Sequence, residues 1–325
     1  MHAEPEQGAK PAAPDIQYRN TDLYSLLEDR RVLAVLDFAD EQAQADDPRI
    51  VPVHLAPWPA QTVREVWRVR EPVDSGETDG IRWARGGGWL LAAVVQAESG
   101  DDIGTAARDG YSALTGFLRQ NPEYHVQRLW NYLDRINAGQ GDEERYRRFC
   151  TGRLEGMNDF FADGFPAATA IGHAEDAGYL QIYCLASRAR GTRIENPRQL
   201  SAWRYPRQYG PVAPSFARAM RLPAEDGLAI SGTAAIQGHQ SQHDGDLAAQ
   251  LGETLTNLRS LVSAGRMDGD LGLHSPLKVY VRHHEHLAEV DAFLAEHLPQ
   301  SPRLLLQADI CRSELLVEID GWHFC

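Results

Sequence analysis

The sequence predicts an α+β protein made of two related units, each a mixed sheet that a pair of helices covers on one face. The order of the elements supports this class. Residues 88–161 alternate short apolar strands with amphipathic helices, and residues 227–298 repeat the same order. Sequence identity between the two stretches is low, so the inference of a repeat rests on element order alone.

The chain begins with a segment that predicts no regular structure. Residues 1–20 are rich in Ala, Pro and Glu without apolar periodicity, which is typical of a disordered arm. We expect one domain over residues 21–165 and a second over residues 166–325. Short β-branched or aromatic segments between turn-forming residues open the first domain, and they predict antiparallel strands at 31–38, 49–56, 63–69 and 80–87.

The first repeat opens with a strand from residue 88, followed by a polar loop. A helix begins after Asp101 or Asp102, because an aspartate at the N-cap accepts hydrogen bonds from the free backbone N–H groups of the first turn. Residues 124–136 predict the next strand, and the helical periodicity of residues 142–161 predicts a second helix.

The second repeat places a loop rich in glycine and histidine, residues 231–246, between its first strand and its first helix. Asp244 or Asp246 caps that helix. The later elements are a strand and a helix within 277–298 and two closing strands at 303–311 and 314–322.

Composition excludes several classes of protein. The formal net charge of −14 opposes general nucleic-acid binding, which relies on clustered Lys and Arg against phosphates. No apolar run approaches the roughly 18 residues that span a bilayer, and the first residues lack a signal-peptide pattern, so no membrane contact and a cytoplasmic location are expected. The four cysteines lie far apart without a CxxC pair, which indicates reduced thiols.

The loop 231–246 contains residue types that bind metals or phosphates elsewhere. His239 and His243 are four residues apart, but in a loop this spacing does not place them on one face, and no third-ligand spacing is present. We therefore expect no metal, and histidines that hydrogen-bond to the loop backbone. Phosphate-binding glycine motifs are absent as well. The strand end leads into a helix N-terminus, where backbone N–H groups can approach an anion.

Three further features have two interpretations each. The arginine-rich segment 188–221 is either a solvated loop paired with surface acids or a surface that binds carboxylates through planar guanidinium groups. Glu318 is either an exposed strand residue or, on a covered face, an acid with a raised pKa. Cys311 is either a buried small hydrophobe or a thiolate favoured by its arginine neighbour.

Four segments have sequences that are specific in combination: 149–161 (FCTGRLEGMNDFF), 229–246 (AISGTAAIQGHQSQHDGD), 277–282 (LKVYVR) and 304–322 (LLLQADICRSELLVEIDGW). Together they resemble the chorismatase family, which is related in fold to the YjgF/RidA proteins. The resemblance covers most of the chain beyond residue 20 and is most specific in the second half. It implies two YjgF/RidA-like units, similar also to chorismate mutase, of which the first is degenerate and the second catalytic.

This resemblance implies cleavage of chorismate to pyruvate and a ring product, without a metal or an organic cofactor. Glu318 falls on the family's glutamate in the closing strand and would protonate the enolpyruvyl methylene carbon. Arg153 and Arg282 match arginines that hold the two carboxylates, and Tyr209 fits a tyrosine that lines the pocket. The expected roles in the loop are a pocket wall for Gly232, Thr233 and Ala234, and loop support for His239, Ser241, His243 and Asp246.

The residue at position 311 implies the product. In chorismatases an alanine there accompanies simple hydrolysis to a dihydroxycyclohexadiene carboxylate, and a cysteine accompanies hydroxybenzoate formation. Cys311 therefore implies a 3-hydroxybenzoate synthase in which the thiol steers the ring intermediate by proton transfer or transient nucleophilic contact. Some members of this branch release 4-hydroxybenzoate as well. Two fused units are compatible with a monomer or a homotrimer.

Two other functions stay open from the sequence. A RidA-type imine hydrolase would share the sheet architecture and the closing strand, although the doubled length and the arginine-rich segment oppose it. A non-catalytic sensor of an anionic metabolite would bind chorismate and leave it intact.

Overall fold

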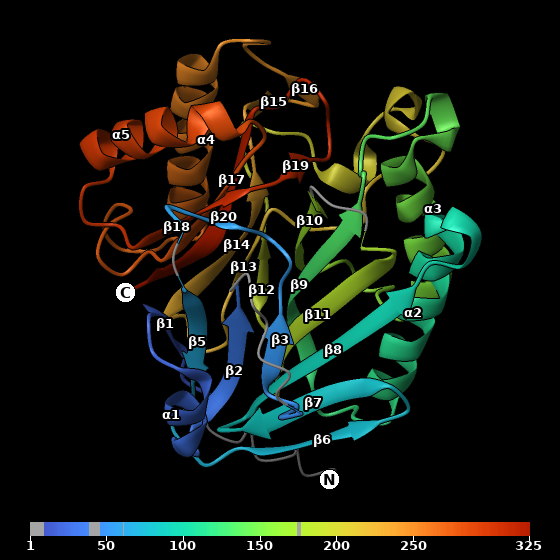
Figure 1. Ribbon diagram of the computed structural model, residues 1–325, viewed down its shortest axis with the longest axis vertical. Helices are drawn as coiled ribbons and strands as arrows, with labels where there is room; N and C mark the ends of the chain where they lie inside the picture. Colours follow the sequence, from blue (N-terminus) through green and yellow to red (C-terminus); the bar gives the residue numbers. More distant parts are fainter. Residues whose placement is uncertain (1–9, 39–45, 61, 174–176) are drawn as a thin grey trace, which may run out of the picture.

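The computed structural model describes residues 10–38, 46–60, 62–173 and 177–325, and it confirms the predicted α+β class. Two seven-stranded sheets, a four-stranded sheet and a two-stranded hairpin make up the β structure. Figure 1 shows one large sheet with its helices on the right and the other with its helices at the upper left. No helix within the described ranges is long and apolar enough to cross a membrane.

The four-stranded sheet belongs to the start of the chain, and it corrects two predictions. Residues 15–19 form a strand that pairs antiparallel with β5 (Arg64–Arg68), so this end of the predicted disordered arm is ordered; residues 1–9 lie outside the described residues. β2 (Val32–Asp37) and β3 (Ile50–Pro52) are parallel, where antiparallel strands are predicted, and the connection 38–49 is long enough for the crossover that parallel strands need. The sheet order is β1 (Asp15–Arg19), β5 (Arg64–Arg68), β2 (Val32–Asp37) and β3 (Ile50–Pro52), with helix α1 (Leu23–Glu28) beside it.

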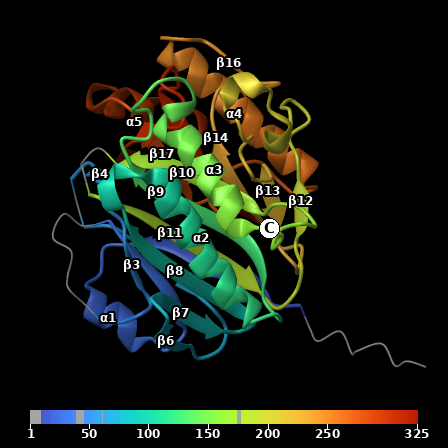
Figure 2. The ribbon, with the colours of Figure 1, turned by 90° about the vertical axis from the view of Figure 1, so that its right-hand side faces the viewer.

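The first large sheet carries α2 (Ile103–Arg119) and α3 (Arg145–Met157), which lie across one of its faces in Figure 2. Asp102 is the N-cap of α2 and accepts a hydrogen bond from the backbone N–H of Thr105 at 3.2 Å. The strand order is β19 (Asp309–Ile310), β10 (Ala167–His173), β9 (His125–Asp134), β11 (Tyr179–Ser187), β8 (Trp89–Ala97), β7 (Ile81–Gly86) and β6 (Asp74–Thr78).

The second large sheet carries α4 (Leu247–Ala264) and α5 (Leu287–His297). Of the two aspartates predicted as the cap of α4, Asp246 holds the position and accepts from the backbone N–H of Ala249 at 3.0 Å. The strand order is β12 (Thr192–Ile194), β13 (Ala219–Arg221), β14 (Gly227–Thr233), β20 (Val317–Phe324), β17 (Leu277–Val281), β18 (Arg303–Gln307) and β4 (Pro57–Trp58). The hairpin β15 (Ile236–Gln237) and β16 (Gln240–Ser241) stands beside it.

All three larger sheets share one core. It contains Trp67 from β5, Trp130 from β9 and Trp322 from β20, and the rings of Trp67 and Trp130 lie 5.4 Å apart. Because each large sheet covers one face with helices, its other apolar face must pack against another sheet. Some strands pair in the sheet of the other predicted domain. β10 and β11 follow residue 165 in the chain and pair in the first large sheet, whereas β4 precedes it and pairs in the second. The predicted domain division at residue 165 stays a prediction.

Candidate active site

A cavity of about 300 Å³ lies where β10 of the first large sheet meets β14 of the second. Side chains from both sheets, from α3 and from the arginine-rich segment face it. The lining residues are Glu144, Tyr146, Arg147, Arg153, Ala168, Thr169, Ala170, Tyr205, Gln208, Tyr209, Pro214, Phe216, Arg218, Gly232, Ala234, Ile236, Cys311, Arg312, Ser313, Glu314 and Glu318.

Glu318 supplies a protonated carboxyl group to this cavity. Glu318 lies on β20 and is 5% exposed. Burial, followed by the negative charge of Asp320, raises the pKa of its carboxyl group to about 8. The positive charges of Arg128, Arg218 and Arg282 oppose this shift but do not cancel it. At neutral pH the group is therefore mainly the neutral acid, the form that can donate a proton.

Strand β14 passes so close to this acid that only a glycine fits at position 232. A Cβ atom on Gly232 would lie 2.0 Å from Oε1 of Glu318. Ala234 also lines the cavity, in agreement with its predicted place in the wall. Thr233 does not: its hydroxyl donates to the carbonyl oxygen of Ser231 at 2.9 Å, and its side chain is buried outside the lining.

Cys311 lies in the wall of the same cavity, but its chemistry differs from the thiolate interpretation. Burial, followed by the nearby Glu318 charge, raises the pKa of the thiol well above its usual value. The positive charge of Arg312 lowers that pKa only in part. The sulfur is therefore a neutral thiol at physiological pH.

Arg153 reaches the cavity from α3, as expected for a carboxylate anchor. The helix can sit close to α2 because Gly152 faces it: a Cβ there would lie 1.9 Å from the carbonyl oxygen of Gly104. Arg153 is 3% exposed, and its Nη2 donates to the carbonyl oxygen of Ser215 at 2.9 Å. Its Nε is buried without a hydrogen-bond partner among the described residues. Because the side chain lines the cavity, its guanidinium group can pair with a bound carboxylate.

Arg282, the second predicted anchor, is not among the residues that line the cavity. Its guanidinium group is bound to the protein on every side and holds the segment that carries Cys311. The acceptors are the carbonyl oxygens of Leu315, Ile310 and Arg312 and the side chains of Asn137 and Asp309, at 2.7–3.0 Å. No donor is left for a ligand.

Arg147, Arg218 and Arg312 are the cavity arginines that the sequence analysis missed. Arg218 donates to the carbonyl oxygen of Leu200 and to the hydroxyl of Tyr205, and its buried Nε has no hydrogen-bond partner within the described ranges. Arg312 stacks over Tyr209, 4.0 Å from the ring centroid. The abundance of arginine in segment 188–221 points to Arg218, but nothing local distinguishes it from its neighbours.

Of the predicted loop-support residues, His239 and Ser241 are held by other side chains rather than by one another. The hydroxyl of Tyr209 contacts Nδ1 of His239 at 3.1 Å. Arg312 donates to the carbonyl oxygen of His239 and to Ser241, which donates to Glu314 at 2.7 Å. The remaining two predicted residues contact each other through the backbone, since the N–H of Asp246 donates to the carbonyl oxygen of His243 at 3.0 Å.

The fold and this site define an enzyme whose arginine-rich cavity surrounds one protonated carboxyl group. The family model described as chorismatase FkbO/Hyg5-like, N-terminal, matches residues 65–186. A 3-hydroxybenzoate synthase of Streptomyces hygroscopicus is 36% identical over 315 residues, which cover 90% of this chain and 91% of that protein. A chorismatase of Streptomyces rapamycinicus is 38% identical over 83% of this chain and 84% of its own length.

A solved chorismatase structure covers 97% of this chain with a TM-score of 0.86 and 33% sequence identity, and the match spans 100% of that structure. The chain belongs to the chorismatase family, which confirms the resemblance found in its sequence. RidA of a Psychrobacter species aligns with 42% of this chain, and with 100% of its own, at 14% identity and a TM-score of 0.33.

Proposed function

We propose that this enzyme cleaves chorismate to pyruvate and 3-hydroxybenzoate. The observation that carries the proposal is the neutral carboxyl group of Glu318 in a cavity lined by arginines. Chorismate has two carboxylates and an acid-sensitive enol ether, so it requires cationic anchors and one proton donor. The names of the two Streptomyces relatives support the same substrate class.

In the proposed reaction Glu318 transfers its proton to the methylene carbon of the enolpyruvyl group. The ether oxygen then shares the positive charge of an oxocarbenium ion, and cleavage of the bond between this oxygen and the ring releases pyruvate. The remaining ring hydroxyl oxygen bridges to the carbon that has lost the ether and stays there, and the ring proton lost on aromatisation returns to the Glu318 carboxylate. The products together contain the atoms of chorismate, so no water is consumed. Arg153 and Arg218, which line the cavity, hold the carboxylates.

The thiol of Cys311 would act as a neutral group beside the ring. Because its pKa is raised, it cannot serve as a standing thiolate nucleophile. It can accept or return a proton only during the rearrangement, when the charge of the adjacent Glu318 changes. The role supported here is therefore guidance of the ring intermediate towards the hydroxybenzoate.

The test is incubation of the purified protein with chorismate, with pyruvate assayed enzymatically and aromatic products separated by chromatography. We expect equal amounts of pyruvate and hydroxybenzoate, and a loss of at least about 100-fold in kcat for Glu318→Gln, which keeps the shape but removes the proton. The matched control is Glu289→Gln, an exposed residue of α5 outside the cavity. Intact chorismate would overturn the proposal, and ammonia release from amino-acid imines would then favour the hydrolase.

A further inference from the structure

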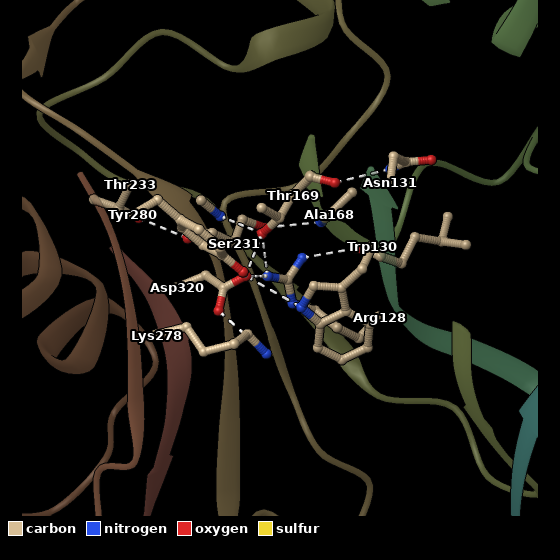
Figure 3. A network of polar contacts seen from close by, with 12 residues as sticks. Arg128, Trp130, Asn131, Ala168, Thr169, Ser231, Thr233, Lys278, Tyr280 and Asp320 are labelled. Carbon is tan, nitrogen blue, oxygen red and sulfur yellow. Dashed lines mark hydrogen bonds and ion pairs between the residues drawn. The ribbon is translucent and has the colours of Figure 1, made fainter. Parts of the chain in front are cut away.

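A buried ionic cluster lies directly behind the proposed acid. Asp320 follows Glu318 by two residues on β20, is 0% exposed, and faces the same way as Glu318. Its Oδ2 accepts from the donors drawn around it in Figure 3, which are Arg128 at 3.1 Å, Trp130 at 3.1 Å, Thr169 at 2.7 Å and Tyr280 at 3.2 Å. Arg128 and Lys278 oppose its charge within the same cluster.

Thr169 belongs both to this cluster and to the cavity wall. Its hydroxyl donates to Asp320 and accepts from the guanidinium of Arg128 and from the backbone N–H of Gly232, the last at 3.0 Å. A hydroxyl has one proton and two lone pairs, so all of its hydrogen-bonding capacity is used. The orientation of this hydroxyl is therefore determined by the cluster.

The backbone at Gly232 is available for this bond because the strand is irregular there. Pairing of β14 with β20 shifts register between Ile230 and Thr233, a feature that frees backbone groups and is common beside active sites. Since a Cβ at Gly232 would collide with Oε1 of Glu318, the glycine backbone forms the surface on which that carboxyl lies. A shift of this backbone would move the wall of the acid's site.

We propose that Thr169 and Asp320 are positioning residues for Glu318, with Asp320 orienting the Thr169 hydroxyl and that hydroxyl holding the Gly232 backbone against the acid. The proposal rests on the proposed function, in which Glu318 is the proton donor. Neither Thr169 nor Asp320 needs to touch the reacting atoms.

Electrostatics agrees with this arrangement. The charged groups that act on Glu318 come from four elements: Asp320 on β20, Arg128 on β9, Arg282 at the end of β17 and Arg218 beside β13. Cys311, which lines the same cavity, is a neutral thiol. Burial raises the pKa of Glu318 most, and the charge of Asp320 raises it next. By holding the Gly232 backbone against the carboxyl group and bonding to Asp320, Thr169 therefore helps to maintain the neutral acid.

The test compares Thr169→Val, which removes the hydroxyl and keeps the branched shape, with Thr169→Ser, which keeps the hydroxyl. We expect kcat for chorismate cleavage to fall about 10- to 100-fold in the valine variant, the scale of one hydrogen bond lost to a charged network, with a much smaller change in KM. The serine variant should restore most of this rate. Equal losses in both variants, or a wild-type kcat in the valine variant, would overturn the proposal.

A control separates positioning from a general loss of stability. Thr115→Val removes a buried hydroxyl that donates to the carbonyl oxygen of Tyr111 in α2, away from the cavity lining. This variant should lower the melting temperature as Thr169→Val does and leave kcat unchanged. If kcat follows the melting temperature in both variants, Thr169 has no positioning role.

A second readout is independent of the substrate. Carboxyl carbon NMR of glutamate-labelled protein, with the Glu318 signal assigned by Glu318→Gln, measures the titration midpoint of that acid. Thr169→Val should lower the midpoint, because a carboxyl that is no longer confined gains water, and Thr115→Val should not. If the wild-type protein leaves chorismate intact, the proposed function fails; an unchanged midpoint in Thr169→Val makes the positioning proposal fail separately.

Discussion

At the scale of single residues, the environment of Glu318 decides what the site can do. The same side chain on an exposed strand would be ionised at neutral pH and would have no proton to give. Burial beside Asp320 raises its pKa to about 8, although three arginines act in the opposite direction. Cys311 responds to the same burial by remaining a thiol, so the site combines two protonated groups with cationic anchors.

The raised pKa predicts the dependence of the rate on pH. If Glu318 must be protonated to act, kcat stays level below a pH of about 8 and falls about tenfold for each further pH unit. The measurement is kcat for pyruvate release across this range, with the coupling assay checked at each pH. A rate that rises through this range would show that an ionised group, acting as a base, limits the reaction.

The same shift has a consequence for stability that does not require substrate. The folded protein holds the Glu318 proton more tightly than the unfolded chain does, so protonation of Glu318 contributes to the free energy of unfolding. This contribution is complete below the ordinary carboxyl pKa and is lost as pH rises to about 8. The measurement is the urea unfolding free energy of the wild type and of Glu318→Gln at both ends of this pH range. The wild type should lose stability relative to Glu318→Gln, at a rate of up to about 1.4 kcal/mol per pH unit.

At the scale of elements, the irregular β14 and the start of α4 determine the shape of the loop between them. β14 leaves regular pairing near Gly232, beside the acid, and the chain then forms the hairpin β15–β16 before α4 begins. Arg312 and Glu314, from the segment before β20, hold this hairpin through Ser241. The loop is therefore held by a neighbouring segment of the sheet and by the cap of its own helix.

The cap of α4 gives a test at this scale, because the sequence offers two aspartates and the structure uses one. Asp246→Ala should cost about 1 kcal/mol of unfolding free energy, since the backbone N–H of Ala249 loses its acceptor. Asp244→Ala is the matched control, because Asp244 is equally exposed and does not cap the helix. Urea denaturation compares the two, and equal losses would contradict the assignment of the cap.

At the scale of the whole molecule, a buried ion pair joins the small sheet to the second large sheet. Nζ of Lys278, on β17, lies 2.9 Å from Oε2 of Glu65, on β5, and 3.6 Å from Oδ1 of Asp320. Both Lys278 and Glu65 are at most 1% exposed. Burial alone would lower the pKa of the lysine, but the charges of Asp320 and Glu65 raise it, so the lysine stays charged.

Removing one partner should therefore be far more costly than removing both. Lys278→Met leaves Glu65 buried without its cation and should cost about 3–5 kcal/mol of unfolding free energy. Adding Glu65→Gln to this variant should recover a large part of the loss, because no uncompensated charge remains between the sheets. Urea unfolding of the two variants and the wild type provides the comparison. If Lys278→Met is as stable as the wild type, the ion pair does not stabilise the contact between the two sheets.

The sequence by itself determined most of the elements and the family, and it predicts the acid. Strand and helix patterns depend on residues close together in the chain, and the predicted strands around β9, β14, β17 and β20 are present. Glu318 and Cys311 were identified because they stand in a contiguous closing segment, 304–322, whose residues resemble those of the family. Local order and local identity are therefore sufficient for these conclusions.

Only the tertiary structure decided which residues act together. It excluded Arg282 and Thr233 from the cavity, placed Arg218 there, and brought Arg128 to Asp320 across 192 positions of the chain. The direction of a guanidinium group and the balance of buried charge depend on neighbours that packing supplies, and no local pattern encodes them. For the same reason the parallel pairing of β2 with β3 and the exchange of strands between the sheets appear only in the folded molecule.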